Sequence, residues 1–99
     1  MLYIVLGKDA DDSLEARRSS REAHLERVEA LLHEGRLELA GPMPAIDASD
    51  PGPAGYSGSV IIAEFDSLDD AQQWADLDPY VASGAWVSVV AKPFIKAKP

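Results

Sequence analysis

The sequence predicts one α+β domain spanning residues 1–99, with an antiparallel four-stranded sheet and two helices on one of its faces. Three observations predict this fold: four short segments rich in aliphatic and β-branched residues, one long amphipathic segment after the first of them, and a shorter capped segment before the last. The resulting order is strand, helix, strand, strand, helix, strand, which is typical of the split βαβ or ferredoxin-like arrangement.

The first strand and the first helix are predicted from the first third of the chain. Residues 2–7, LYIVLG, are aliphatic, β-branched or aromatic up to a closing glycine, which predicts a buried strand. Residues 13–34 then repeat apolar residues at helical spacing, and Gly35 follows at the C-cap position. We expect an amphipathic helix of about twenty residues, whose packed face contains Leu25, Val28, Leu31 and Leu32.

Two strands separated by a long loop are predicted next. Residues 36–41 alternate leucine with charged residues, which indicates an edge strand with one wetter face. Residues 42–58 hold four prolines and three glycines, so we expect no regular structure there but a cover or a link. Residues 59–65, SVIIAEF, form the third strand.

The last helix and strand follow from a cap and an apolar run. Ser67 with Asp70 resembles a capping box, with aspartate for the usual glutamate, and predicts a helix through Trp74. Residues 85–94 form the fourth strand, which we expect to end where Pro93 interrupts the hydrogen-bond ladder.

The segments LYIVL and VIIA lack the alternation of polar residues that a sheet with one wet face should have. Both helices cover the same face, so something else must cover the other one. A second copy of the sheet would cover it with matched chemistry, and the sequence therefore predicts a homodimer packed sheet to sheet.

Composition excludes several classes of function. The formal charge of −8 disfavours nucleic acid and anionic membranes as partners. No cysteine is present, so disulfides and thiolate sites are excluded. The apolar start is too short for a secretory signal, and we expect a cytoplasmic protein. Residues 95–99 form a short basic tail, which we expect to be solvated.

One stripe of the first helix, at spacings i, i+4, i+7 and i+11, contains Arg17, Arg21, His24 and Val28. His24 on this stripe could be a half-buried general base or a histidine at the rim of the core. His33, in the last turn, is expected to interact with the negative end of the helix dipole. The two histidines lie on different helix faces, so no metal site is expected.

Asp78 is the predicted partner of His24. Pro79 disfavours the α region for the residue before it, so the second helix should end there and leave Asp78 extended. An ordinary helix stop would give the same dipeptide. Paired with Asp78, however, His24 would have a fixed tautomer and raised basicity, the minimum for proton transfer near neutral pH.

Three further residues are candidates for substrate binding. Tyr80 and Trp86 could wall the site with apolar surface, and Arg21 could hold an anionic or enolic oxygen. Core packing is the alternative role for the two aromatic residues.

Two longer motifs resemble a known family. They are RxxHLxxVxxLxxxGxLxLAGP over residues 21–42 and FDSLDDAQQWADLDPY over residues 65–80, followed by a closing strand. In this order and spacing they are similar to the YCII-related (YciI-like) proteins over nearly the whole chain. The resemblance implies a ferredoxin-like dimeric α+β barrel and an active site centred on a histidine and an aspartate, which correspond to His24 and Asp78.

One branch of this family resembles a dehydrochlorinase acting on chlorinated hydroxyquinols, so the resemblance implies lyase chemistry by general acid and base. The chain departs from the family mainly in residues 42–58. Our leading hypothesis is a cofactor-independent enzyme acting on a small aromatic or enolisable compound. The alternative is a non-catalytic dimeric domain that binds a small molecule, and an acidic protein-interaction domain ranks third.

Overall fold

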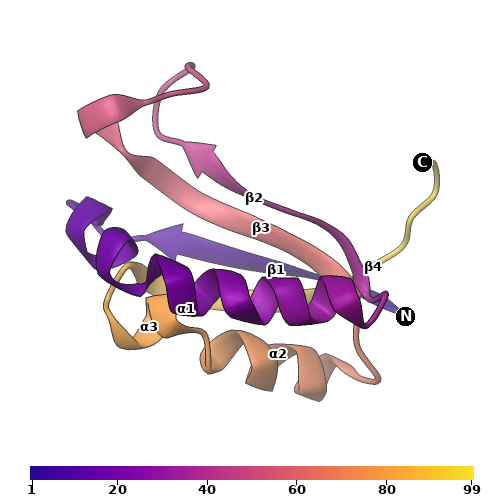
Figure 1. Ribbon diagram of the computed structural model, residues 1–99. Helices are drawn as coiled ribbons and strands as arrows, with labels where there is room; N and C mark the ends of the chain where they lie inside the picture. The colour runs from indigo at the N-terminus through magenta and orange to yellow at the C-terminus, as the bar shows by residue number, and fades with distance from the viewer.

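The sheet of this protein contains four antiparallel strands in the order β2-β3-β1-β4. The computed structural model describes all 99 residues. Its strands and helices, labelled in Figure 1, are β1 (Leu2–Asp9), α1 (Leu14–His33), β2 (Leu37–Pro44), β3 (Tyr56–Glu64), α2 (Leu68–Asp76), α3 (Pro79–Ala82) and β4 (Trp86–Phe94). The predicted ferredoxin-like order of strands and helices is confirmed, with β1 and β3 in the centre of the sheet.

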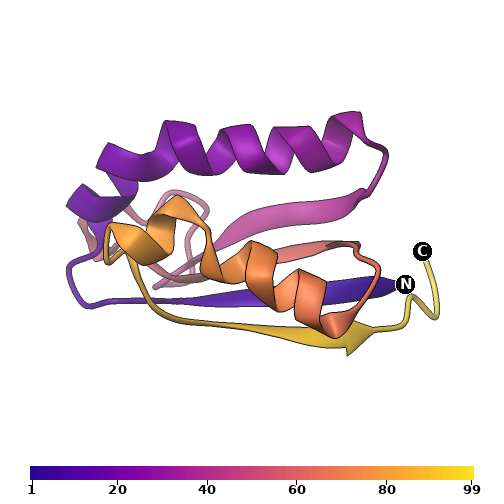
Figure 2. The same ribbon diagram turned by 90° about the horizontal axis from the view of Figure 1, so that it is seen from below.

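All the helices lie on one side of the sheet, as Figures 1 and 2 show. In β1, side chains alternate between the two faces, and the buried ones that face the helices are Tyr3, Val5, Gly7 and Asp9. The core between the two layers includes Leu31 of α1, Ile61 of β3 and Ala71 of α2. A charged residue, Asp9, thus takes the same inward phase as the core residues of its strand.

The face that α1 packs against the sheet differs from the predicted one. Leu25 and Leu32 are exposed, and the buried residues of α1 are Arg17, His24, Val28 and Leu31. The expectation for those two leucines was wrong because α1 is turned so that the stripe containing His24 faces the sheet. Buried polar groups require partners, and both Arg17 and His24 have a carboxylate partner.

The segment 42–58 contains more regular structure than expected. Strand β2 continues through Pro44 and β3 begins at Tyr56, so the irregular part is shorter and includes a 3₁₀ turn at Gly52–Ala54. Prolines are tolerated in β2 because it is an edge strand. The backbone N–H of Ala45 donates to Gly55, which leaves the nitrogen of Pro44 on the open edge.

The second helix begins as predicted and is followed by a helix that was not predicted. Ser67 caps α2 by accepting a hydrogen bond from the Asp70 N–H. After α2, Asp78 is extended, with φ −64° and ψ 135°, and it is the N-cap of α3, with Pro79 in the first turn. An aspartate followed by proline is a helix start as well as a helix stop, and this second meaning was missed.

The face of the sheet opposite the helices is apolar at its centre, with Lys92 beside Ile4 and Glu64 beside Leu2 towards one end. Cross-strand pairing puts Ile4 beside Ile62 and Leu6 between Val60 and Val90 on this face. Leu39 of β2, 49% exposed, lies on it as well. None of the helices has the length and hydropathy that crossing a bilayer would require.

Candidate functional site

His24 and Asp78 are in direct contact, although they lie 54 positions apart in the sequence. His24 Nδ1 lies 2.9 Å from each carboxylate oxygen of Asp78. An ionised carboxylate only accepts hydrogen bonds, so the imidazole donates from Nδ1, and its other nitrogen, Nε2, has no proton in the neutral tautomer. The exposed fraction is 7% for His24 and 1% for Asp78, so the pair is largely shielded from bulk water.

Two groups besides His24 fix the position of Asp78. Its Oδ1 accepts a hydrogen bond from the Tyr80 N–H at 2.9 Å, as the N-cap of α3. Arg27 lies 3.4 Å from Oδ2 and also donates to the carbonyl of Trp74 at 2.6 Å. The carboxylate is therefore oriented from both sides before it meets His24.

The imidazole of His24 packs against two aromatic rings, which also contact each other with their centroids 5.3 Å apart. Tyr80 stacks on it, with the centroids 4.1 Å apart and the planes 12° apart, and Trp86 meets it edge-on at 5.6 Å. Trp86 lies directly over Gly7 of β1, where a Cβ would collide with the indole. The absence of a side chain at Gly7 thus makes room for the ring that supports His24.

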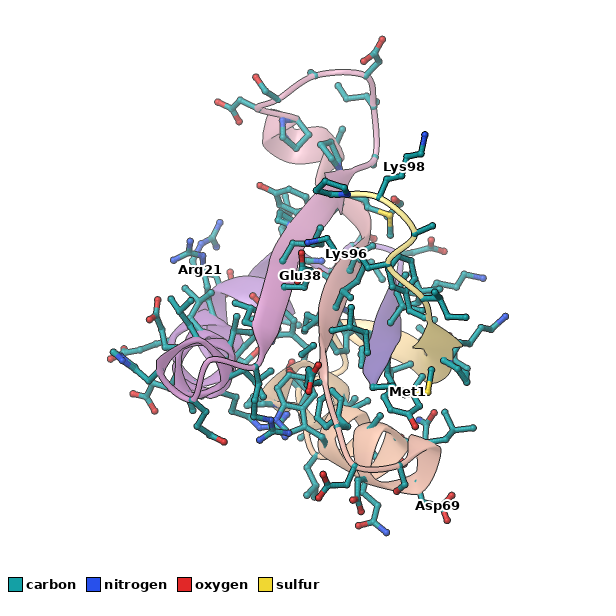
Figure 3. The ribbon with its side chains drawn as sticks, turned by 90° about the vertical axis from the view of Figure 1, so that its right-hand side faces the viewer. Met1, Arg21, Glu38, Asp69, Lys96 and Lys98 are labelled. Atoms are coloured by element: carbon teal, nitrogen blue, oxygen red, sulfur yellow. The ribbon has the colours of Figure 1, made fainter.

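A cavity of about 260 Å³ lies beside His24, between α1 and strands β2 and β3. Arg21 and Tyr80 line it together with His24, so the structure brings these three predicted residues together. Trp86 does not line it and packs behind the imidazole, in the core. Figure 3 shows that the Arg21 side chain extends outward from α1.

His24 lines this cavity, and its second ring nitrogen, Nε2, has no partner within the protein. This nitrogen is not among the fully enclosed unpaired atoms, which comprise only Nε1 of Trp86. An imidazole with a carboxylate at Nδ1 and an open Nε2 has the geometry needed to accept a proton from a bound molecule.

A second buried network, which the sequence analysis missed, adjoins the His24 pair. Arg17 donates from Nε and Nη2 to the two oxygens of Asp9, at 2.6 and 2.8 Å, and from Nη2 to Ser59 Oγ at 2.9 Å. Its guanidinium also lies 4.7 Å from the ring centre of Tyr56 and 5.1 Å from that of Tyr80. The guanidinium of Arg17 therefore packs against the Tyr80 ring, and this ring in turn stacks on His24.

Signals for this network were present in the sequence. Asp9 continues the inward phase of Tyr3 and Val5 in the first strand, and Arg17 lies on the same helical stripe as His24. When a strand and a helix each carry a charged residue at an inward-facing position, and the two charges are opposite, a buried ion pair is indicated. Neither signal specifies that the two elements meet at these residues.

Burial and local charge shift the pKa of three groups around the site. Burial raises the pKa of Tyr80, and the positive charges of Arg17 and Arg21 only partly oppose this effect. Burial tends to lower the pKa of Arg17, but the hydrogen bond and charge of Asp9 raise it overall. Burial lowers the pKa of Arg27, partly offset by Asp78. Tyr80 is therefore a neutral phenol at neutral pH and can donate a hydrogen bond.

No group of three or more histidine, aspartate and glutamate side chains gathers where it could hold a metal ion. His33 is exposed at the end of α1, away from the buried His24.

Comparison with known proteins identifies the family. The profile of the YCII-related domain matches residues 1–95. Protein YciI of Escherichia coli O6:H1 is 58% identical over 96 residues, which cover 97% of this chain and 98% of that protein. A protein of Haemophilus influenzae is 46% identical over the same shares of both chains.

A solved structure shares the fold at lower sequence identity. It is that of 5-chloro-2-hydroxyhydroquinone dehydrochlorinase from Burkholderia phenoliruptrix AC1100, in complex with 2,5-dihydroxybenzoquinone. The TM-score is 0.81 with 24% identity, over 96% of this chain and 94% of that one. The profile match and the two relatives show the family, and the solved structure has the same ferredoxin-like fold. This chain therefore belongs to the YCII-related family.

Proposed function

We propose that this protein is a cofactor-independent enzyme in which His24 transfers a proton to and from a small aromatic or enolisable compound. The observation that supports this most directly is the contact of His24 Nδ1 with both oxygens of Asp78, at 2.9 Å, beside a cavity of about 260 Å³. Asp78 orients the ring and stabilises the imidazolium that forms when Nε2 takes a proton.

The remaining residues support the two charged species in such a step. When His24 Nε2 removes a proton from a carbon next to a carbonyl group, the C–H electron pair forms a carbon–carbon double bond and the carbonyl π pair moves to its oxygen, which gives an enolate. Arg21, at the cavity wall, is a fixed positive charge that could stabilise this oxygen. The neutral hydroxyl of Tyr80 is a second donor at the same wall.

The choice of substrate class rests on the lining and on a structural neighbour. The cavity has apolar walls from Val28, Leu37 and Ile61, which suit a small ring. The neighbour with the same fold is named as a dehydrochlorinase and was solved with a dihydroxybenzoquinone bound. Lyase chemistry of this type needs a base that removes a proton from a carbon or a hydroxyl oxygen of the substrate. His24 would be that base.

Proton exchange with solvent tests this proposal without knowledge of the product. A panel of small phenols, hydroxyquinols and keto acids is incubated with the protein in D₂O, and loss of C–H signals is followed by NMR. We expect at least one compound to exchange faster with the protein, and His24→Ala to lower that rate by about 10²- to 10⁴-fold.

The control is His33→Ala, which removes the exposed histidine of the same helix and should leave the rate unchanged. Circular dichroism of both variants confirms that the fold is intact. A His24→Ala variant that exchanges at the wild-type rate contradicts the proposal. Compounds that bind saturably but never exchange contradict it too, and would favour a non-catalytic binding domain.

A further inference from the structure

A second cavity of about 270 Å³ adjoins the one beside His24. Each is lined by the same four residues, Arg17, Arg21, Pro42 and Tyr80, so the two hollows meet along this shared wall. The second hollow adds Leu14, Arg18 and Tyr56 on the side away from His24. A molecule that reaches the imidazole can therefore extend past Arg21 and Tyr80 into a second, separate space.

The charged side chains that line the two cavities are all basic, whereas the chain as a whole is acidic. The formal net charge is −8, yet no aspartate or glutamate lines either cavity, and both include arginines. A concentration of positive side chains in a hollow of an acidic protein attracts anions.

The five arginines of the chain differ in how they are neutralised, and Arg21 is the one without an ion pair. Arg17 is bound by both oxygens of Asp9. Arg18 pairs with Glu15 on the surface, where the two side chains are 72% and 80% exposed, and an exposed pair of this kind is easily exchanged. Arg21 and Arg18 are thus the cations available to a ligand.

The other walls suit a planar acid. Tyr56 and Tyr80 present rings, and Leu14 and Pro42 present apolar atoms. A guanidinium binds a planar carboxylate through two parallel N–H donors, which makes arginine better suited to this group than lysine. The Tyr80 phenol is protonated at neutral pH, and burial raises its pKa further, so its hydroxyl can donate to the same anion.

We propose that the second cavity is an anion subsite, in which Arg21 and Arg18 bind a carboxylate of the substrate while its reacting ring or enol lies beside His24. This inference rests on the proposed function for the identity of the reacting end. It restricts the substrate class to small acids with an acidic group at one end and an enolisable or phenolic group at the other.

Binding of matched compounds tests the subsite. Isothermal titration compares 2,5-dihydroxybenzoate with hydroquinone, which has the same ring and hydroxyls but no carboxylate, and with benzoate, which has only the carboxylate. We expect the carboxylate to improve affinity for the wild-type protein by about tenfold or more. Arg21→Gln should remove this gain, and Arg18→Gln should reduce it.

Arg36→Gln is the control, because Arg36 pairs with Glu34 and lines neither cavity. It should leave the carboxylate preference unchanged. Amide chemical shifts locate the ligand: 2,5-dihydroxybenzoate should perturb Tyr56 and Arg21, and hydroquinone should not perturb Tyr56. The proposal is overturned if neither carboxylate compound binds better than hydroquinone, or if Arg21→Gln keeps the full preference.

His24→Asn separates this inference from the proposed function. The variant should lose proton exchange and keep the preference for the carboxylate, because the subsite does not involve the imidazole. A wild-type protein that shows the preference but no proton exchange would retain the subsite and remove the catalytic role of His24.

Discussion

Asp78 combines a structural and a chemical role in one side chain. It caps α3 through the Tyr80 N–H, accepts from His24 Nδ1 and lies against Arg27, all while 1% exposed. A buried donor left without its partner costs about 1–3 kcal/mol, and a lost N-cap costs about 1 kcal/mol. Its contribution to the free energy of unfolding is therefore separable from any contribution to catalysis.

We predict that Asp78→Ala lowers the free energy of unfolding by about 3 kcal/mol, because it removes the cap and leaves His24 unpaired. Asp78→Asn should cost less, because the amide oxygen can still accept from the Tyr80 N–H. Urea denaturation measures both. Asp76→Ala is the matched control, because Asp76 lies two residues before Asp78 and is exposed. Its replacement should change the free energy of unfolding by no more than about 0.5 kcal/mol. Equal losses at positions 76 and 78 would contradict the assigned role of Asp78.

The pairing of His24 with Asp78 could be predicted because each residue has a local signal. A proline fixes the backbone of Asp78, and helical spacing puts His24 on the stripe beside the core. The packing of Trp86 against the imidazole had no such local signal. Gly7 and Trp86 are distant in the sequence, and only the register of β1 against β4 brings the glycine under the indole. Tertiary register of this kind is not contained in local patterns.

At the scale of elements, α2 is tied to the free edge of β4 by one side chain. Gln72 accepts from the Ala91 N–H at 2.8 Å and donates to the Val89 carbonyl at 3.2 Å. Strand β4 pairs only with β1, so these two backbone groups have no partner strand. The amide of Gln72 thus takes the place of a neighbouring strand, and β4 accepts Pro93 within its range because its outer edge is open.

We predict that Gln72→Ala lowers the free energy of unfolding by about 1–3 kcal/mol, since two hydrogen bonds contribute about 0.5–1.5 kcal/mol each. The amide of Ala91 should also exchange with solvent faster. Urea denaturation and hydrogen exchange measured by NMR test the two effects. Gln73→Ala, at the exposed neighbouring position of α2, is the control. Unchanged protection at Ala91 in the Gln72 variant would contradict this account of the edge.

The elements themselves were predicted from periodicity and caps, and the errors lie where two principles compete. Prolines and glycines in residues 42–58 indicated a loop, but an edge strand tolerates proline, so β2 extends into the segment, and β3 extends with it as its pairing partner. The dipeptide at Asp78 and Pro79 indicated a helix end, although the same pair also begins α3. Which principle prevails depends on the position of the segment in the sheet, which single-residue signals do not specify.

At the scale of the whole molecule, the sheet has one face covered by helices and one that no helix covers and whose centre is apolar. Leu39 at 49% and Val90 at 42% are the more exposed members of this face, on β2 and β4. Bare apolar faces of this kind are typical of surfaces that associate. A twofold axis would bring the same face of a second chain against it and complete a barrel-like dimer. The dimer remains a prediction from the sequence and from this face.

We predict that the protein sediments at twice the chain mass of 10.6 kDa, and that Leu39→Lys or Val90→Lys produces monomers. A charge without a partner in an apolar interface costs about 3 kcal/mol or more, which raises the dissociation constant at least about 100-fold. Leu77→Lys is the matched control, because Leu77 is exposed at the end of α2, away from the sheet. Analytical ultracentrifugation over a range of concentrations measures all four proteins. A wild-type chain that sediments as a monomer at every concentration, or a Leu77→Lys variant that dissociates as Val90→Lys does, would show that this face is not the dimer interface.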